Sequence, residues 1–260
     1  MIPSRAQQHL IALGTIAYKE THRYLRIWPQ TLLPPAVTMT LYFIIFGNLI
    51  GPRIGTMDGY AYIDFIVPGI IMMSVITNSY TNVASSFFSA KFQRHIEEML
   101  VSPTPNYIIL LGYLIGGIGR GLLVGLVVTL ISVAFTRLPI HNIAITVSVV
   151  FLTATLCAMG GFINAIYGRK FDDIAIVPTF VLTPLTYLGG VFYSIALLPP
   201  VWQHVSQLNP ILYTVNAFRY GILGASDINI ATAYIILLLF IAMLGWVCLH
   251  LLSKGTGLRQ

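Results

Sequence analysis

Long uncharged apolar runs, separated by short polar interruptions, are the dominant pattern in this chain. The run at residues 31–50 carries no charged side chain. As an α-helix rising 1.5 Å per residue, it would extend about 30 Å, the thickness of the hydrocarbon core of a bilayer. Five further runs of at least 20 residues occupy positions 61–88, 106–135, 143–166, 174–193 and 230–252. The pattern therefore predicts six transmembrane helices.

One shorter apolar stretch leaves the number of crossings open. Residues 211–224 are too few to cross the bilayer comfortably, and they include Arg219. We expect a re-entrant or interfacial segment here, and a seventh crossing is the competing interpretation. Further breaks precede it in the chain, at Pro199 and Pro200 and at Asn209 and Pro210.

Composition supports an all-α integral membrane protein. The 260 residues are 57% hydrophobic and only 8% charged, whereas soluble domains typically carry about 25% charged residues. In lipid, backbone polar groups must be satisfied internally, which favours helices. The net charge of +6 does not indicate nucleic-acid binding, because no basic stripe with interleaved aromatic residues is present.

The distribution of Lys and Arg predicts the orientation. One set of polar segments holds ten of these residues and the other set holds three. The ten-charge set is 1–30, 89–105, 167–173 and 253–260, and the three-charge set is 51–60, 136–142 and 194–229. Cytoplasmic loops carry the excess of positive charge. We therefore expect both termini, including the tail 253–260, in the cytoplasm and residues 194–229 outside.

Two polar segments show helical periodicity. In residues 5–28, Lys19, Arg23 and Arg26 recur at spacings of four and three, which predicts an amphipathic helix on the inner membrane surface. Either anionic lipid headgroups or a cytoplasmic partner would explain it. In residues 91–100, three apolar residues share one stripe and charged residues lie elsewhere. The stripe is Phe92, Ile96 and Met99. This helix suits docking in a protein groove, although a simple interfacial turn would show the same pattern.

Polar residues inside the spans are candidates for a translocation path. Arg120 lies near the middle of its run, where an unpaired charge costs at least about 3 kcal/mol, so it should face the protein interior. It either lines a path or anchors a neighbouring helix. Asn78 and Asn82 in the second run suit either a wet cavity or interhelical hydrogen bonds. Asp64, near the start of that run, is expected to reach the outer interface.

Catalytic and metal-binding chemistry is not apparent in the sequence. No G-x-x-x-x-G-K-[ST] phosphate loop occurs, and the glycines of the third run follow the small-xxx-small spacing of closely packed helices. They are Gly112, Gly116, Gly117, Gly121 and Gly125. Cys157 and Cys248 lie in apolar runs away from metal-ligand partners. We expect no catalytic residues, no metal and no cofactor on this chain.

Two stretches resemble the type-2 ABC exporter permeases. KFQRHIEEMLVSPTPNYIILLGYLIG is similar to the cytoplasmic loop and third-span entry of that family. PLTYLGGVFYSIALLPPVWQHVSQLNPILYTVNAFRYGIL is similar to the end of its fifth span and its outer re-entrant segment, although Gly189 and Gly190 replace the common Ser-Gly. The resemblance covers essentially the whole chain. It points in particular to bacterial inner-membrane permeases made as separate half-size subunits, including nodulation-factor and polysaccharide exporters.

The resemblance implies a permease driven by a separate ATPase that binds ATP and Mg, with a second permease copy completing the transporter as a homodimer. Residues 1–30 would hold the connecting helix and 31–252 the permease domain. The coupling helix would be 91–100, with Lys91, Phe92, Arg94, Ile96, Glu97, Glu98, Met99 and Leu100. An outer re-entrant segment at 194–222 would cap the exit, with Pro199, Pro200, Asn209, Pro210 and Arg219. The alternatives are an intramembrane enzyme or a passive channel, but neither a catalytic constellation nor a filter-like loop is evident.

Overall fold

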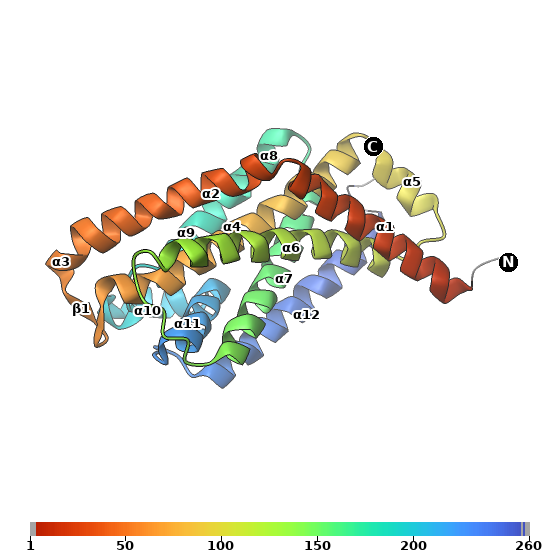
Figure 1. The fold of residues 1–260 in the computed structure, drawn as a ribbon. Helices are drawn as coiled ribbons and strands as arrows, with labels where there is room; N and C mark the ends of the chain where they lie inside the picture. Colours follow the sequence, from red (N-terminus) through yellow and green to blue (C-terminus); the bar gives the residue numbers. More distant parts are fainter. Residues whose placement is uncertain (1–3, 256, 258–260) are drawn as a thin grey trace.

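The computed structural model describes residues 4–255 and residue 257, and it is about 82% helical (Figure 1). Within the described residues, six helices are long and apolar enough to cross a membrane. They are Trp28–Ile54, Tyr62–Phe92, Asn106–Ser132, Ile143–Tyr167, Phe171–Leu188 and Ile230–Lys254. The predicted all-α membrane fold and its six spans are confirmed, and residues 211–224 are not among the candidate spans.

The first span is preceded by a helix of its own. Helix α1 (Arg5–Arg26) begins with a capping box, in which the Ser4 main-chain N–H donates to Gln7 Oε1 at 2.9 Å. After a break at Ile27, the span continues as α2 (Trp28–Tyr42), the π-helix η1 (Phe43–Ile50) and α3 (Gly51–Ile54). A hairpin follows, formed by β1 (Thr56–Met57) and β2 (Tyr60–Ala61).

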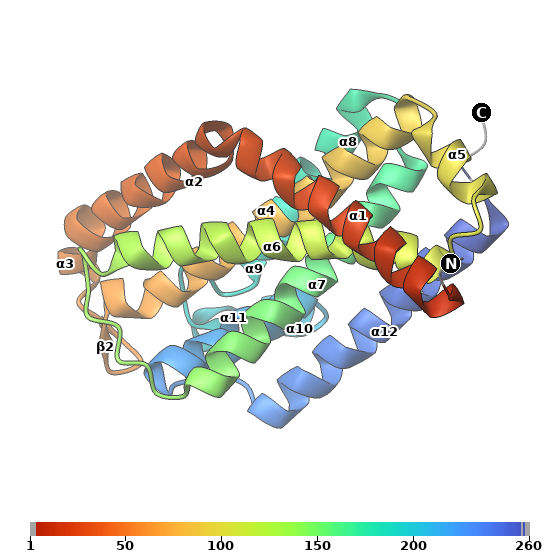
Figure 2. The same ribbon diagram turned by 45° about the vertical axis from the view of Figure 1, so that its right-hand side comes forward.

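Helix α4 (Tyr62–Phe92) is the centre of the fold. The most apolar part of this span is 78% buried, and it packs against α6 (Asn106–Ser132) and α7 (Ile143–Tyr167) (Figure 2). Phe87 illustrates the packing, because its ring lies 5.1 Å from that of Tyr113 in α6 and 4.1 Å from that of Phe162 in α7. Two of the remaining spans are far less covered within the described chain, at 17% for Trp28–Ile54 and 6% for Phe171–Leu188.

The glycines of α6 let two helices approach it on different faces. A Cβ atom on Gly116 would lie 2.6 Å from Glu20 Cβ in α1, and one on Gly121 would overlap the Ser79 hydroxyl in α4. Gly112 likewise meets α1, whereas Gly117 and Gly125 meet α4. Real Cβ atoms do not approach so closely, so these positions require glycine. The predicted small-residue spacing thus packs α6 against both α1 and α4.

The second half of the chain closes the bundle. The fifth span comprises α8 (Phe171–Val177), the π-helix η2 (Pro178–Leu182) and α9 (Thr183–Leu188). It ends five residues before the predicted 193, because the chain turns at Gly189 and Gly190, whose φ is +74°. Short helices η3 (Ile195–Leu197), α10 (Pro200–Gln207) and α11 (Pro210–Leu223) precede the last span, α12 (Ile230–Lys254).

The two ends of the bundle are formed by different elements. In both views, the start of α1, the end of α12 and helix α5 (His95–Val101) lie at one end, which we call the α5 end. The hairpin, α3 and α11 lie toward the opposite end (Figures 1 and 2).

Candidate functional site

The segment 91–100 is not one helix, so this part of the sequence prediction is wrong. Helix α4 continues through Phe92, and α5 begins only at His95. Between them Arg94 adopts a left-handed conformation with φ of 63°, which changes the direction of the chain. The apolar stripe expected along a single helix is therefore divided between two.

Lys91 belongs to the core of the α5 end and not to a docking surface. Its side chain is buried, and its Nζ donates to the main-chain oxygens of Ile166 at 2.5 Å and Gly168 at 2.8 Å. These acceptors lie at the end of α7, where helix carbonyls lack intrahelical partners. Lys91 thus fixes the end of α4 to the end of α7, which corrects its assignment to a coupling contact.

The apolar residues of this region face two ways. Ile96 is only 1% exposed and packs into the core of the chain itself, so it cannot fill a groove in another protein. Met99 and Leu100 are half-buried against the same core. Phe92 is 57% exposed and Val101 is 88% exposed. The outward-facing residues form what we call the α5 surface: Phe92, Gln93, Arg94, His95, Glu98 and Val101.

Phe92 also has contacts inside the chain. Its ring lies 6.0 Å from that of Phe88 and 5.2 Å from that of Phe171, at the start of the fifth span. Glu97, at the first turn of α5, is half-buried beside this surface. The α5 surface therefore adjoins the buried Phe88 of α4 and the exposed Phe171 of α8.

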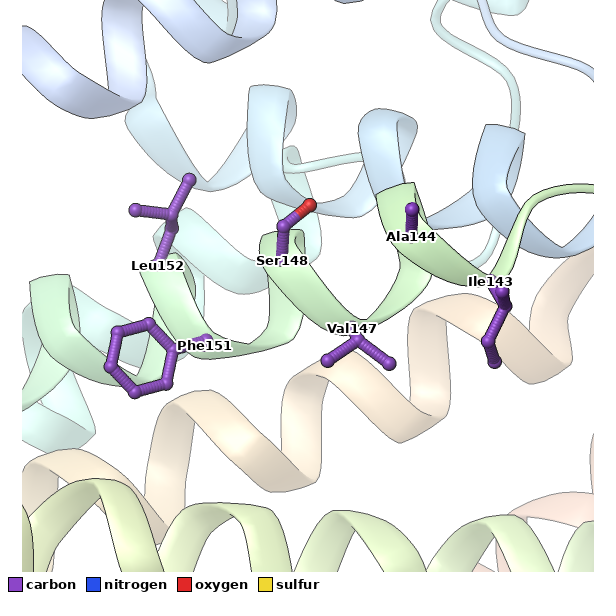
Figure 3. A pocket seen from close by; sticks show the side chains of 6 residues that line it. All are labelled: Ile143, Ala144, Val147, Ser148, Phe151 and Leu152. Atoms are coloured by element: carbon purple, nitrogen blue, oxygen red, sulfur yellow. The ribbon is translucent and has the colours of Figure 1, made fainter.

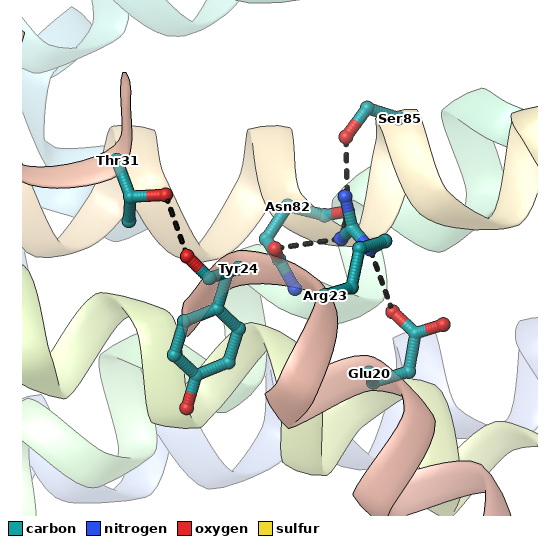
Figure 4. A network of polar contacts seen from close by, with 6 residues as sticks. All are labelled: Glu20, Arg23, Tyr24, Thr31, Asn82 and Ser85. Carbon is teal, nitrogen blue, oxygen red and sulfur yellow. Dashed lines mark hydrogen bonds and ion pairs between the residues drawn. The ribbon is translucent and has the colours of Figure 1, made fainter. Parts of the chain in front are cut away.

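A polar cluster joins α1 and α4 (Figure 4). Arg23 Nη2 donates to Asn82 Oδ1 at 2.8 Å and to the Asn82 main-chain oxygen at 3.1 Å. Arg23 Nε lies 3.5 Å from Glu20 Oε2. Both acceptor residues are buried, with Glu20 at 1% and Asn82 at 0% exposure. Counted from the Phe92 end of α4, Asn82 lies about 15 Å along the helix.

Several polar atoms in and near this cluster have no hydrogen-bond partner. Among the described residues, neither carboxylate oxygen of Glu20 accepts a hydrogen bond, and Asn82 Nδ2 and Arg120 Nε have no acceptor. Arg120 follows Gly116 by one turn of α6 and is half-buried. The buried Glu20 carboxylate thus has one ion-pair partner, Arg23 of its own helix.

The structure changes the list of path candidates. Asn82 belongs to the cluster, whereas Asn78 donates to the Ser74 main-chain oxygen of its own helix at 3.0 Å. Glu20 is the residue that sequence reasoning missed. It lies on the buried stripe of α1 with Ile16 and Tyr24, at the i, i+4, i+8 spacing that marks one helix face.

At the opposite end, Arg219 holds the short helix α11 in place. It is 1% exposed, its Nη2 donates to the Gly190 main-chain oxygen at 2.5 Å, and its guanidinium lies 3.8 Å from the centre of the Phe65 ring. Asp227 binds the adjoining turn, accepting from the Ser194 hydroxyl at 2.9 Å. Arg219 is thus a buried structural anchor between α11, α4 and the glycine turn.

The helix breaks of this segment lie where the sequence placed them. Pro200 begins α10, and Asn209 caps α11 by accepting from the Ile211 main-chain N–H at 3.0 Å, with Pro210 in the first turn. Pro199 precedes α10 as its N-cap. Helix α10 exposes an apolar face, Val201, Trp202, Val205 and Leu208. Near the same end, the Thr136 hydroxyl donates to Asp64 Oδ1.

Within the described residues, no group of three or more His, Cys, Asp or Glu side chains could hold a metal ion. Cys157 and Cys248 are buried free thiols.

Comparison with known proteins decides the class of this chain. Residues 11–223 match the model of a family described as ABC-2 type transporter. The chain belongs to this family. It is a membrane permease component of an ABC transporter and not itself an enzyme, and membership in the ABC-2 family implies an ATPase partner.

Individual relatives agree with the family. The chain is 57% identical over 250 residues to the inner membrane transport permease YadH of Escherichia coli K12, covering 96% of this chain and 98% of the relative. It is also 23% identical over 191 residues to nodulation protein J of Rhizobium meliloti, covering 73% of each chain. Nodulation protein J of Neorhizobium galegae is 22% identical over 230 residues, covering 88% of each chain.

Proposed function

We propose that this chain and a second identical copy form the translocation path of an exporter, and that a separate ATPase binding ATP and Mg docks on the α5 surface. The observation that carries this proposal is the division of residues 91–101 into buried and exposed parts. Phe92 and Val101 expose apolar area beside the charged Arg94 and Glu98. Apolar anchors surrounded by a polar rim are typical of protein interfaces.

The buried half of the same region would transmit the motion. Ile96 fixes α5 to the core, and Lys91 fixes the end of α4 to the end of α7. A push on the α5 surface would therefore move α4 and α7 together, because packed interiors respond as connected bodies. Phe92 would pass the same motion to the fifth span through its contact with Phe171.

The proposed orientation puts the α5 surface where an ATPase can reach it. The segments 1–30, 89–105, 167–173 and 253–260 carry ten Lys and Arg against three in the other set, and α5 lies within 89–105, so we expect the α5 end to face the cytoplasm. The membrane would be the bacterial inner membrane, as in the name of the E. coli relative. Residues 194–222 would then lie outside.

The proposed second copy is supported by the uneven burial of the spans. Trp28–Ile54 and Phe171–Leu188 are only 17% and 6% buried within the chain, so they have ample surface for a partner copy or for lipid. Residues 194–222 would cap the exit between the copies, with the apolar face of α10 at their boundary. The basic face of α1 would meet anionic lipid headgroups.

Purification in mild detergent tests the proposal. The chain should retain an ABC ATPase subunit in a 1:1 ratio, and the complex should contain two copies of each. A monodisperse permease that retains no ATPase, isolated under conditions where a known ABC transporter stays intact, would contradict it.

A further inference from the structure

A lateral apolar cavity of about 220 Å³ lies between α6 and α7. Helix α4 contributes Val75 to its wall, α6 contributes Leu126, and α7 contributes Val147 and Val150. Phe218 and Ile222 of α11 form another part of the wall. The cavity therefore borders α11, the short helix that Arg219 anchors, at residues other than those that make the Arg219 contacts.

The lining offers nothing to a polar ligand. No charged side chain is among the described residues of the wall. The hydroxyls of its two threonines already donate within their own helices: Thr129 donates to the Gly125 oxygen at 2.7 Å, and Thr146 donates to the Asn142 oxygen at 2.9 Å. A buried water needs two to four polar partners, so this cavity excludes water.

The cavity is continuous with a surface that faces lipid. Leu126 is 57% exposed and Val147 is 60% exposed, and both lie in membrane spans. Val147 also belongs to a shallow hollow along the start of α7, which includes Ile143 and Phe151 (Figure 3). In that view, Val147 and Ile143 extend from the same side of α7. An apolar route thus leads from the side of the bundle into the cavity.

We propose that the acyl chain of a membrane phospholipid occupies this cavity. Hydrocarbon is the medium that surrounds the spans, and a void without contacting atoms forfeits the dispersion attraction of its walls. A flexible, unbranched chain can lie against the exposed wall residues Leu126 and Val147 and extend along the wall toward Val150 and Phe218. The phospholipid belongs to the leaflet on the side of the loop between α6 and α7, because the wall residues lie toward that end of both helices.

The bound chain supports α11. Phe218 and Ile222 lie on either side of Arg219 in the sequence of α11, and both form part of the cavity wall. An acyl chain in the cavity therefore packs against α11. Phospholipid that binds the folded protein raises its unfolding temperature by mass action. This inference does not depend on the ATPase or on the proposed orientation.

Photolabelling in nanodiscs tests the location. The probe is a phosphatidylethanolamine with a diazirine near the end of one acyl chain, and adducts are mapped by mass spectrometry. We expect adducts concentrated on the peptides with Leu126, Val150 and Phe218. Val150→Phe, which fills the cavity, should lose them, whereas Leu239→Phe on the exposed face of α12 should keep them. Adducts spread evenly over all lipid-facing helices would overturn the proposal.

Two further measurements guard against a misfolded variant and a different occupant. Val147→Trp closes the mouth and should lose labelling while its helix content stays as in the wild type. Adding phospholipid to delipidated protein should raise the unfolding temperature of the wild type and Leu239→Phe more than that of Val147→Trp. An equal rise in all three contradicts the proposal. If Val147→Cys instead forms a disulfide-linked dimer and the cavity stays unlabelled, a second copy occupies it and the proposal is wrong.

Discussion

Arg23 in α1 donates two hydrogen bonds to Asn82 in α4, at 2.8 Å to the side-chain oxygen and 3.1 Å to the main-chain oxygen. This contact joins a helix that precedes the first span to the centre of the second span. The same guanidinium lies 3.5 Å from the buried carboxylate of Glu20. Helix α1 is therefore anchored to the bundle by a polar contact and not only by its apolar face.

Removing Arg23 should destabilise the protein through Glu20. Arg23→Met leaves the Glu20 carboxylate buried without its ion-pair partner, at a cost of about 1–3 kcal/mol. The unfolding temperature in detergent should fall. Arg26→Met changes an exposed arginine in the same helix and should have little effect. The double variant Glu20→Gln with Arg23→Met should recover part of the loss. No recovery would show that Glu20 is not the source of the cost.

Arg120 should matter more than an arginine in a wet loop. Arg120→Ala removes a half-buried charge from the middle of a span and should reduce transport or thermal stability. Arg53→Ala removes an exposed arginine and serves as the control. Thermal unfolding and transport are measured for both variants. Equal activity and equal stability would mean that Arg120 reaches solvent freely and makes no use of the cluster around Glu20.

Gly121 should tolerate a methyl group only if Ser79 makes room. The Cβ of Gly121→Ala would overlap the Ser79 hydroxyl, so α6 and α4 must separate and the unfolding temperature should fall. Adding Ser79→Ala removes that hydroxyl and should restore part of the stability. Gly14→Ala is the control, because no atom lies within 4 Å of its Cβ position. An additive double variant, with no rescue, would contradict the close packing described here.

The orientation can be read from engineered thiols. In a background without Cys157 and Cys248, a membrane-impermeant maleimide added outside should label Arg137→Cys in the loop after α6. Gln93→Cys at the α5 surface should react only after the membrane is permeabilised. The reverse pattern would place the α5 end outside and remove the basis for ATPase docking there.

The six spans were predictable because the bilayer thickness sets a minimum length for apolar runs, and that signal survives in the sequence without tertiary context. The end of the fifth span was missed because Gly190 turns with φ of +74°, which hydropathy does not register. The short hairpin carried a usable signal, since Asp58 and Gly59 form the two-residue Asp-Gly turn typical of hairpins, with φ of 49° and 84°.

The candidate site was harder to predict because its contacts are tertiary. Periodicity placed Phe92, Ile96 and Met99 on one stripe, but it assumes a continuous helix, and the left-handed Arg94 breaks that helix. Glu20 looked like an ordinary interfacial charge because its burial comes from tertiary packing, including the close approach of Gly116 in α6. Arg120 was expected to face the interior, and its side chain is half-buried in the structure.

The most direct test of the account measures coupling through the α5 surface. Val101 is 88% exposed and has no large contacts to lose, so Val101→Asp should leave the fold intact. Ile140→Asp, at an exposed apolar residue of the opposite end, is the matched control. Purified complexes are compared for retained ATPase and for ATP hydrolysis that depends on the permease. We predict that both fall together in Val101→Asp and stay unchanged in Ile140→Asp, whereas normal ATPase retention and hydrolysis in a well-folded Val101→Asp protein would contradict docking at the α5 surface.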